Sequence, residues 1–166
     1  MTRRSMTKRA AIVTATAIVA VGTVGTVAAT AGTDAPRQPT KKAIAGLFTT
    51  WNAALQTGDP EKVADLYAKD AVLLPTVSNK VRTDRAGIVD YFQHFLENKP
   101  VGNKVQTIIK VLDSDSAIDT GVYEFTLTDP DTGAKRVVEA RYTYEYEKRG
   151  GQWKIVNHHS SAMPEG

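Results

Sequence analysis

The stretch Gly151-Gln-Trp-Lys-Ile-Val-Asn-His-His-Ser-Ser-Ala-Met-Pro164 is the most informative part of this chain. Trp153, Ile155 and Val156 can anchor a strand in a core, and the polar run His158–Ser161 falls at the C-terminal end of that strand. Successive side chains point to opposite faces of a strand, so one of the two histidines should look into the fold and the other away from it. Most buried polar groups have a hydrogen-bonding partner, so an inward histidine indicates a polar point in an otherwise apolar cavity.

The composition favours one domain with a core of ordinary size. The chain has 166 residues and no cysteine, which excludes a disulfide framework, a thiolate metal site and a cysteine nucleophile. The formal net charge is +3, and much of it comes from four residues near the N-terminus: Arg3, Arg4, Lys8 and Arg9. The remainder is close to neutral, so we expect no nucleic-acid partner.

The N-terminus has the pattern of an export signal. A basic start is followed by an apolar run from Ala10 to about Ala31, and Ala29-Thr30-Ala31 has the small-x-small form of a cleavage site. We therefore predict a signal peptide at 1–31 and an exported, secreted protein. The alternative is an uncleaved membrane anchor, since the run is long enough to span a bilayer. Thr2–Lys8 also resembles a twin-arginine motif, so the export route stays open between the Sec and twin-arginine types.

A linker and three helices are predicted next. Residues 32–40 contain two prolines and form a linker to a domain at 41–166. Thr40 should cap a first helix that ends near Gly58, because apolar residues recur there at helical spacing. A second helix should start at Pro60 and have an apolar side that includes Tyr67. A third helix, capped by Thr83 or Asp84, should run to about Leu96.

The rest of the chain is predicted to be mostly strand. Lys69-Asp70 is predicted as a turn that leads into a short strand at 71–75. Four longer strands are expected at 104–112, 117–127, 135–147 and 152–160, separated by turn residues. This order predicts an α+β roll, with about three N-terminal helices packed on one face of a strongly curved antiparallel sheet.

Alternation separates two faces of the predicted sheet. Tyrosines such as Tyr123 and Tyr144 lie on the face that should cover the helices, since that arrangement removes the most apolar area from water. The other face offers four candidates for an oligomer interface: Glu124, Glu139, Arg141 and Thr143. It is expected either to be solvated or to pack against another copy, with opposite charges paired across neighbouring strands.

Several phrases of the sequence, in order, resemble a known superfamily. They are TWNAALQTGDPEKVADLYAKDAVLLP, VRTDRAGIVDYFQHFLENKPVG, DTGVYEFTL, ARYTYEYEKRGGQWKIV and HHSSAMPE, and together they cover nearly all of 41–165. The chain resembles the nuclear transport factor 2-like superfamily, also called SnoaL-like, whose fold is cystatin-like. Within it, the chain is most similar to the association domain of calcium/calmodulin-dependent protein kinase II and to its bacterial relatives, the SgcJ/EcaC group.

The resemblance implies a cone with a pocket at one end and self-association through the outer sheet face. Trp51 stands where steroid isomerases of this fold have an oxyanion-binding tyrosine, and the strand that carries their acidic base offers no carboxylate here. Tyr123 and Tyr144 stand where the kinase domain has pocket arginines, so the resemblance implies a more neutral, aromatic pocket. The tail histidine of the kinase domain matches His159.

Six residues are therefore candidates for a pocket or ligand site: Trp51, Tyr67, Tyr123, Tyr144, His158 and His159. Each has the alternative of a purely structural place in the core. Adjacent histidines on a strand cannot both bind one metal ion, and we predict neither a metal nor a cofactor. No histidine–carboxylate relay is evident beside Ser160 and Ser161, so a hydrolase triad is not expected.

Two functions remain open at this point. The first is an exported homo-oligomeric protein, a homodimer or higher, that binds a small apolar or aromatic ligand in the cone and has, at most, a minor enzymatic activity. The second is a self-association module without catalysis. A continuous cavity of a few hundred cubic ångströms would support the first function, and an interior filled by side chains would support the second. No catalytic residue is predicted.

Overall fold

The computed structural model describes residues 37–164. The predicted signal peptide and the first part of the linker lie outside the described residues. Helix α1 spans Lys41–Gln56, and the Thr40 hydroxyl oxygen accepts a hydrogen bond from the Ala43 amide at 3.1 Å, which confirms the predicted cap. Within residues 37–164, no helix combines the length and apolar character that crossing a membrane requires.

The next two helices have caps as well, and in both the cap is an acidic side chain. Helix α2 spans Pro60–Ala64 and is capped by Asp59, whose carboxylate accepts from two amides of the first turn. Helix α3 spans Arg85–Phe95, and the Asp84 carboxylate accepts from the Gly87 amide at 2.7 Å. A short 3₁₀ turn, η1 at Leu96–Asn98, follows α3. Of the two caps considered for this helix, the structure selects Asp84.

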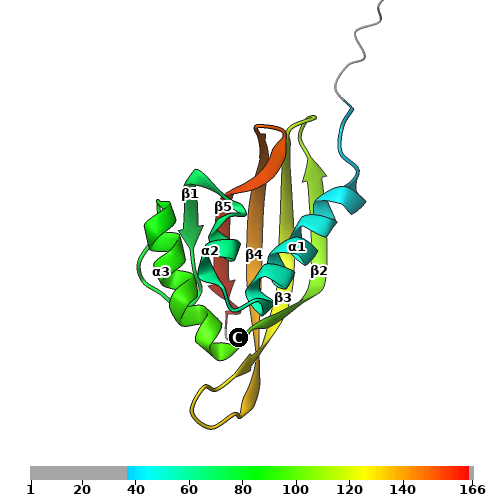
Figure 1. The fold of residues 1–166 in the computed structure, drawn as a ribbon. Coiled ribbons are helices and arrows are strands. Elements are labelled where there is room, and N and C mark those ends of the chain that lie inside the picture. The colour runs from blue at the N-terminus through cyan, green and yellow to red at the C-terminus, as the bar shows by residue number, and fades with distance from the viewer. Residues whose placement is uncertain (1–36, 165–166) are drawn as a thin grey trace, which may run out of the picture. The chain divides into compact units, whose positions relative to one another are not determined.

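Five strands form one mixed sheet. They are β1 at Tyr67–Leu74, β2 at Val101–Val111, β3 at Ser116–Thr128, β4 at Lys135–Arg149 and β5 at Gln152–Ala162. The strand order is β1-β5-β4-β3-β2, and the helices lie on one face of the sheet (Figure 1). The last four strands form the predicted antiparallel meander. The α+β fold and the curved sheet are therefore confirmed.

The first strand differs from the prediction in three ways. Helix α2 ends at Ala64, so Tyr67 begins β1 and is not part of the helix. The turn expected at Lys69-Asp70 is wrong, because both residues lie within β1. The strand also pairs in parallel with β5, with an irregularity between Tyr67 and Val72. Pairing on both sides of Lys69-Asp70, at Tyr67 and at Val72, with a strand almost ninety residues away overrides the local turn preference.

The two faces of the sheet follow the predicted alternation. The side chains that are buried beneath the helices come from alternate positions of β3 and β4: Tyr123, Phe125, Leu127, Ala140, Tyr142, Tyr144 and Tyr146. From α1, Trp51 packs into this layer, with its ring centroid 5.6 Å from that of Tyr144 and 6.1 Å from that of Phe125. The aromatic face therefore covers the helices, as expected.

A bulge and a side-chain clamp shape the far edge of the sheet. The register of β2 against β3 shifts between Lys104 and Gln106, and such a bulge bends the strand that carries it. Gly121 allows the close approach there, since a Cβ at this position would lie 2.0 Å from the Gln106 carbonyl oxygen. The Asn52 side chain of α1 accepts from the Gly102 amide at 2.8 Å and donates to its carbonyl at 2.9 Å. This amide joins α1 to β2.

Candidate functional site

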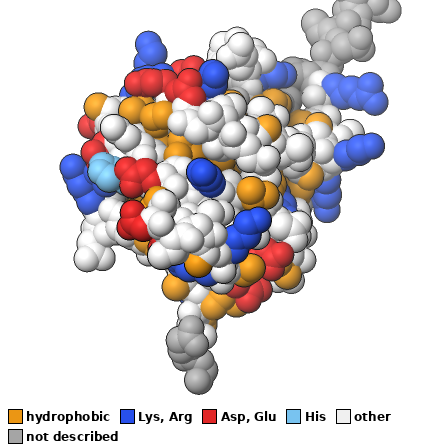
Figure 2. Space-filling model, turned by 60° about the horizontal axis from the view of Figure 1, so that its bottom comes forward, with side chains coloured by type: hydrophobic (Ala, Val, Ile, Leu, Met, Phe, Trp, Pro, Cys, Tyr) orange, Lys and Arg blue, Asp and Glu red, His pale blue; other side chains and the backbone are white. Residues whose placement is uncertain are grey.

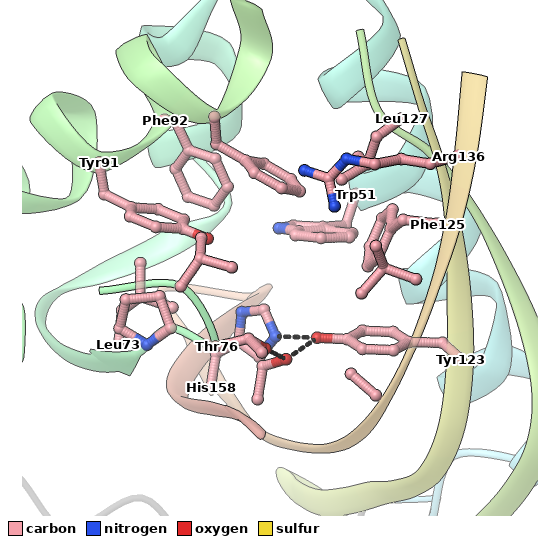
Figure 3. A pocket seen from close by; sticks show the side chains of 16 residues that line it. Trp51, Leu73, Thr76, Tyr91, Phe92, Tyr123, Phe125, Leu127, Arg136 and His158 are labelled. Carbon is pink, nitrogen blue, oxygen red and sulfur yellow. Dashed lines mark hydrogen bonds between the residues drawn. The ribbon is translucent and has the colours of Figure 1, made fainter. Parts of the chain in front are cut away.

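An inner cavity of about 60 Å³ lies between helices α1 and α3 and the inner face of the sheet (Figure 3). Most of its wall is apolar or aromatic, and the larger side chains in it are Trp51, Tyr91, Phe92, Phe95, Tyr123 and Phe125. Ligand pockets for drug-sized molecules usually measure about 300–1,000 Å³. The inner cavity is therefore large enough only for a small group or for one end of a larger molecule.

The floor of the inner cavity is polar. His158, Ser160 and Thr76 line it together with the hydroxyl of Tyr123 (Figure 3). The Tyr123 hydroxyl donates to Ser160 Oγ at 2.6 Å, and Ser160 in turn shares a hydrogen bond with the Thr76 hydroxyl. The His158 Nε2 atom lies 3.5 Å from the Tyr123 oxygen. Four strand and loop residues thus place their polar ends at one point of an apolar chamber.

A second chain of hydrogen bonds holds the Nδ1 edge of the His158 ring. Its Nδ1 atom lies 2.8 Å from the Tyr67 hydroxyl, and the Trp51 indole donates to the same hydroxyl at 3.1 Å. The imidazole also stacks on the Tyr144 ring, with centroids 4.1 Å apart. One face and the Nδ1 edge of the ring are therefore held by side chains of the core, which pre-orients the imidazole.

Burial controls the charge of this cluster. His158 is only 3% exposed, and burial lowers the pKa of its imidazole from 6.5 to about 3, with a smaller contribution from the neighbouring His159. Burial also holds the pKa of the Tyr67 hydroxyl well above its ordinary value. At neutral pH the cluster is consequently uncharged, with a neutral imidazole and protonated phenols.

The position of His158 on β5 explains why its side chain faces inward. On β5 it follows Ile155 after a bulge that faces the Glu145–Tyr146 step of β4, and it pairs with Tyr144 of β4 and Leu73 of β1. Both of these neighbours are buried. His159 is the next residue, so it points to the outer face and is exposed. The structure thereby resolves which histidine is inward.

The structure brings together only part of the predicted site. Trp51, Tyr123 and His158 line the inner cavity. Tyr67 and Tyr144 are buried behind them and contact His158 without lining the cavity. His159 lies apart from the cavity on the opposite face, for the geometric reason just given.

The sequence analysis did not select most of the residues that line the cavity, and four of these are polar. Thr76 and Ser160 contribute to the floor. Tyr91 and Arg136 also line the cavity (Figure 3). The spacing of Ser160 two residues after His158 was the available signal, because it places both side chains on one face of β5.

A buried ion pair forms a second polar cluster that the sequence did not indicate. Asp119 is fully buried and pairs with Lys104, and the Tyr142 hydroxyl donates to the same carboxylate at 2.9 Å. The Lys104 ammonium also lies 4.8 Å from the centroid of the Phe48 ring. Burial lowers the pKa of Lys104, and its hydrogen bond to Asp119 opposes that shift. The pair joins β2 and β3 on the inner face of the sheet.

The four predicted interface residues lie on the outer face, which we define as the sheet surface opposite the helices. The expected pairing of opposite charges there is wrong, because Glu124 lies directly across from Glu139 in the β3–β4 register. Arg141 lies across from Val122 and from Ser161, and makes no ion pair within the described residues. Thr143 shares a hydrogen bond with Thr120 at 3.0 Å.

The lower end of the molecule in Figure 1, where the β3–β4 hairpin lies, carries charges of both signs. Figure 2 turns this end toward the viewer and shows acidic and basic side chains interspersed with hydrophobic and uncharged ones.

Among residues 37–164, no group of three histidine, cysteine, aspartate or glutamate side chains is arranged to hold a metal ion.

Comparison with known families shows to which family the chain belongs. The family model of the calcium/calmodulin dependent protein kinase II association domain matches residues 40–164. The chain belongs to this family. A Xanthomonas campestris protein assigned to the same association domain is 58% identical, with a TM-score of 0.75, and the match covers 81% of this chain and 97% of that protein.

More distant structures share the fold of this association domain. A nuclear transport factor 2-like protein from Salmonella enterica has a TM-score of 0.65 at 16% identity, over 75% of this chain and 91% of that one. A ketosteroid isomerase-like protein from Erwinia carotovora atroseptica has a TM-score of 0.61 at 16% identity, over 74% and 95%. The expected nuclear transport factor 2-like fold is confirmed. A comparison with curated proteins finds no match.

The cavity of this association domain has no acidic side chain in its described walls. Leu73 and Pro75, at the end of β1 and just after it, line the cavity as apolar groups. Among the described residues that line it, none is acidic. The walls therefore offer hydrogen-bond donors and a neutral imidazole, and no carboxylate that could abstract a proton.

Proposed function

We propose that this protein is a self-associating module, in which the outer face of the sheet packs on the same face of another copy. The observation that carries this proposal is the charge arrangement of the outer face. Two glutamates lie directly opposite each other, at Glu124 and Glu139, and like charges in such a pair are destabilising. Arg141, on the same face of β4 as Glu139, has no acidic partner within the described residues.

A two-fold symmetric contact would give Arg141 an acidic partner. In such an interface the same patch occurs on both copies, so an arginine of one copy can meet the glutamates of the other. Opposite charges can therefore meet between two copies of this face, although they do not pair within one copy. Charge complementarity of this kind fixes the register of an interface and disfavours other partners.

Exposed apolar side chains on the same face support the proposal. Val101, Thr126 and Val137 lie in one row across β2, β3 and β4, and the two valines are 46% and 63% exposed. Ile108, in another row of the outer face, is 47% exposed. Exposed apolar groups that gather on one face are typical of protein–protein contact surfaces. The name of the family, an association domain, agrees with this assignment.

The oligomeric state of the full-length chain tests the proposal. We expect a dimer or higher oligomer in analytical ultracentrifugation at micromolar concentration. Arg141→Glu should raise the dissociation constant by about 100-fold, because it replaces a basic group beside Glu124 and Glu139 with another acidic one. Arg37→Glu is the matched control, since Arg37 precedes α1 and is not part of the sheet. The double variant Glu139→Arg with Arg141→Glu should restore much of the association.

Two results would contradict this function. One is a monomeric wild-type chain at these concentrations. The other is an oligomer that withstands Arg141→Glu as well as it withstands Arg37→Glu, which would place the contact elsewhere.

Binding of a small ligand is a second candidate, favoured by the polar floor of the inner cavity. The floor presents hydrogen-bonding groups in an apolar chamber, which is typical of ligand sites. The volume of about 60 Å³ is, however, below the few hundred cubic ångströms that would support binding of a whole small molecule. We therefore place ligand binding second, and we assign it only to small groups.

We also propose that the chain is exported, because residues 1–31 have the sequence features of a signal peptide.

A further inference from the structure

The hydrogen bonds behind His158 run in one direction. The Trp51 indole N–H can only donate, so the Tyr67 oxygen, 3.1 Å away, must accept from it. The hydroxyl proton of Tyr67 then needs an acceptor of its own. Among the described residues, the one within reach is His158 Nδ1, at 2.8 Å.

This direction decides which imidazole nitrogen of His158 carries the proton. Because Nδ1 accepts from Tyr67, the proton of the neutral ring resides on Nε2. In the other tautomer, Tyr67 would receive two N–H groups, from Trp51 and from Nδ1, and its own proton would have no acceptor. A buried donor without a partner is costly, so the core selects the Nε2–H form.

The Nε2–H group is poorly used within the protein. The nearest acceptor is the Tyr123 oxygen at 3.5 Å, longer than the usual 2.7–3.2 Å of an N–H···O bond. Tyr123 gives its own proton to Ser160 at 2.6 Å. His158 is 3% exposed and lines the inner cavity. The cavity thus contains a buried, oriented donor that is only weakly satisfied.

We infer that the inner cavity binds the carbonyl end of an uncharged apolar molecule, and that the carbonyl oxygen accepts a hydrogen bond from His158 Nε2–H. This inference rests on the second candidate function. The walls beside the floor are aromatic and apolar, which suits the body of such a molecule. A volume of about 60 Å³ admits only one end of it, since a closed cavity of about 150 Å³ is the size that holds a benzene ring.

The charged and titratable groups around the cavity argue against a basic ligand. The floor contributes Tyr123 and His158, and the helical wall contributes Tyr91. Burial raises the pKa of both tyrosine hydroxyls and lowers that of His158, so all three are neutral near pH 7. Arg136 is the one charged residue among the described residues that line the cavity. A basic ligand would find no carboxylate there.

Two matched small molecules test the inference on the full-length chain. Cyclopentanone and methylenecyclopentane have nearly the same shape, and only the ketone has an acceptor oxygen. With ¹⁵N-labelled histidine, NMR should show His158 protonated at Nε2 and unprotonated at Nδ1. The ketone should shift the Nε2–H resonance and bind about tenfold more tightly than the hydrocarbon, the ratio expected for one buried hydrogen bond.

Variants distinguish the His158 donor from the Tyr67 hydrogen bond that fixes its tautomer. His158→Phe keeps a ring of similar size and should abolish the preference for the ketone. Tyr67→Phe removes the hydroxyl donor that fixes the tautomer, so a mixture of the two imidazole tautomers should appear even if ligand binding becomes weak. His159→Gln, on the outer face, is the matched control and should leave both the tautomer and the preference unchanged.

The outcomes are distinct from those of the association experiment. An Nδ1–H tautomer in the wild-type chain, equal affinity for the two molecules, or no binding of either would overturn the inference. Cyclopentanecarboxylate binding more tightly than cyclopentanone would also overturn it, because an anion would then be the favoured occupant. Sedimentation of the same samples shows whether self-association persists, so failure of one idea leaves the other testable.

Discussion

Acidification should destabilise this protein through His158. The imidazole is neutral and buried in the folded state, where its pKa is about 3, compared with about 6.5 in an unfolded chain. Because the folded pKa is the lower one, the stabilisation is complete above about pH 6.5 and is lost as the pH falls toward 3. Between pH 8 and pH 5 the loss is RT ln(1 + 10^1.5), or about 2 kcal/mol.

Urea denaturation at the two pH values measures this loss. For a slope of about 2 kcal/mol per molar urea, the midpoint should fall by about 1 M on going from pH 8 to pH 5. Other groups also titrate in this range, so the test is the difference between the wild type and His158→Gln. Glutamine keeps an acceptor for Tyr67 and a donor toward Tyr123, but it does not titrate. This variant should therefore lack about 2 kcal/mol of the pH dependence.

His159→Gln serves as the control. His159 is exposed and contributes only the smaller part of the shift at His158, so this variant should keep most of the wild-type pH dependence. If His158→Gln and the wild type lose the same free energy between pH 8 and pH 5, then His158 is not held neutral in the folded state, and the reasoning about the cavity floor fails with it.

Two further predictions concern other buried polar groups. Lys104→Met leaves the fully buried Asp119 carboxylate without its cation and should cost about 3–5 kcal/mol of unfolding free energy in urea melts, whereas Lys104→Met combined with Asp119→Leu should recover most of that loss; a single variant as stable as the wild type would refute the pairing. The Tyr144 hydroxyl is buried without a hydrogen-bond partner in the described residues, so Tyr144→Phe should be neutral or stabilising. Tyr67→Phe breaks two hydrogen bonds and should cost about 1–3 kcal/mol; equal effects of the two Tyr→Phe changes on the midpoint of thermal unfolding would contradict this difference.

Several features of the fold could be predicted from local sequence. The cap at Thr40 and the ends of helices α1 and α3 depend on side chains within a few residues. The alternation of tyrosines along β4 was enough to separate the inner from the outer face, because the side-chain period of a strand is fixed by its backbone geometry. The same rule required that only one of His158 and His159 could be inward.

The sequence alone determined the α+β order, the aromatic inner face and the presence of one inward histidine, since each follows from periodicity within a single element. The tertiary structure decided that β1 joins β5 in parallel, that Asp119 is fully buried beside Lys104, and that the cavity measures about 60 Å³. These features depend on contacts between residues distant in the sequence, and on how closely side chains from different elements fill the shared volume. No local pattern of residues encodes these long-range contacts or the closeness of the packing.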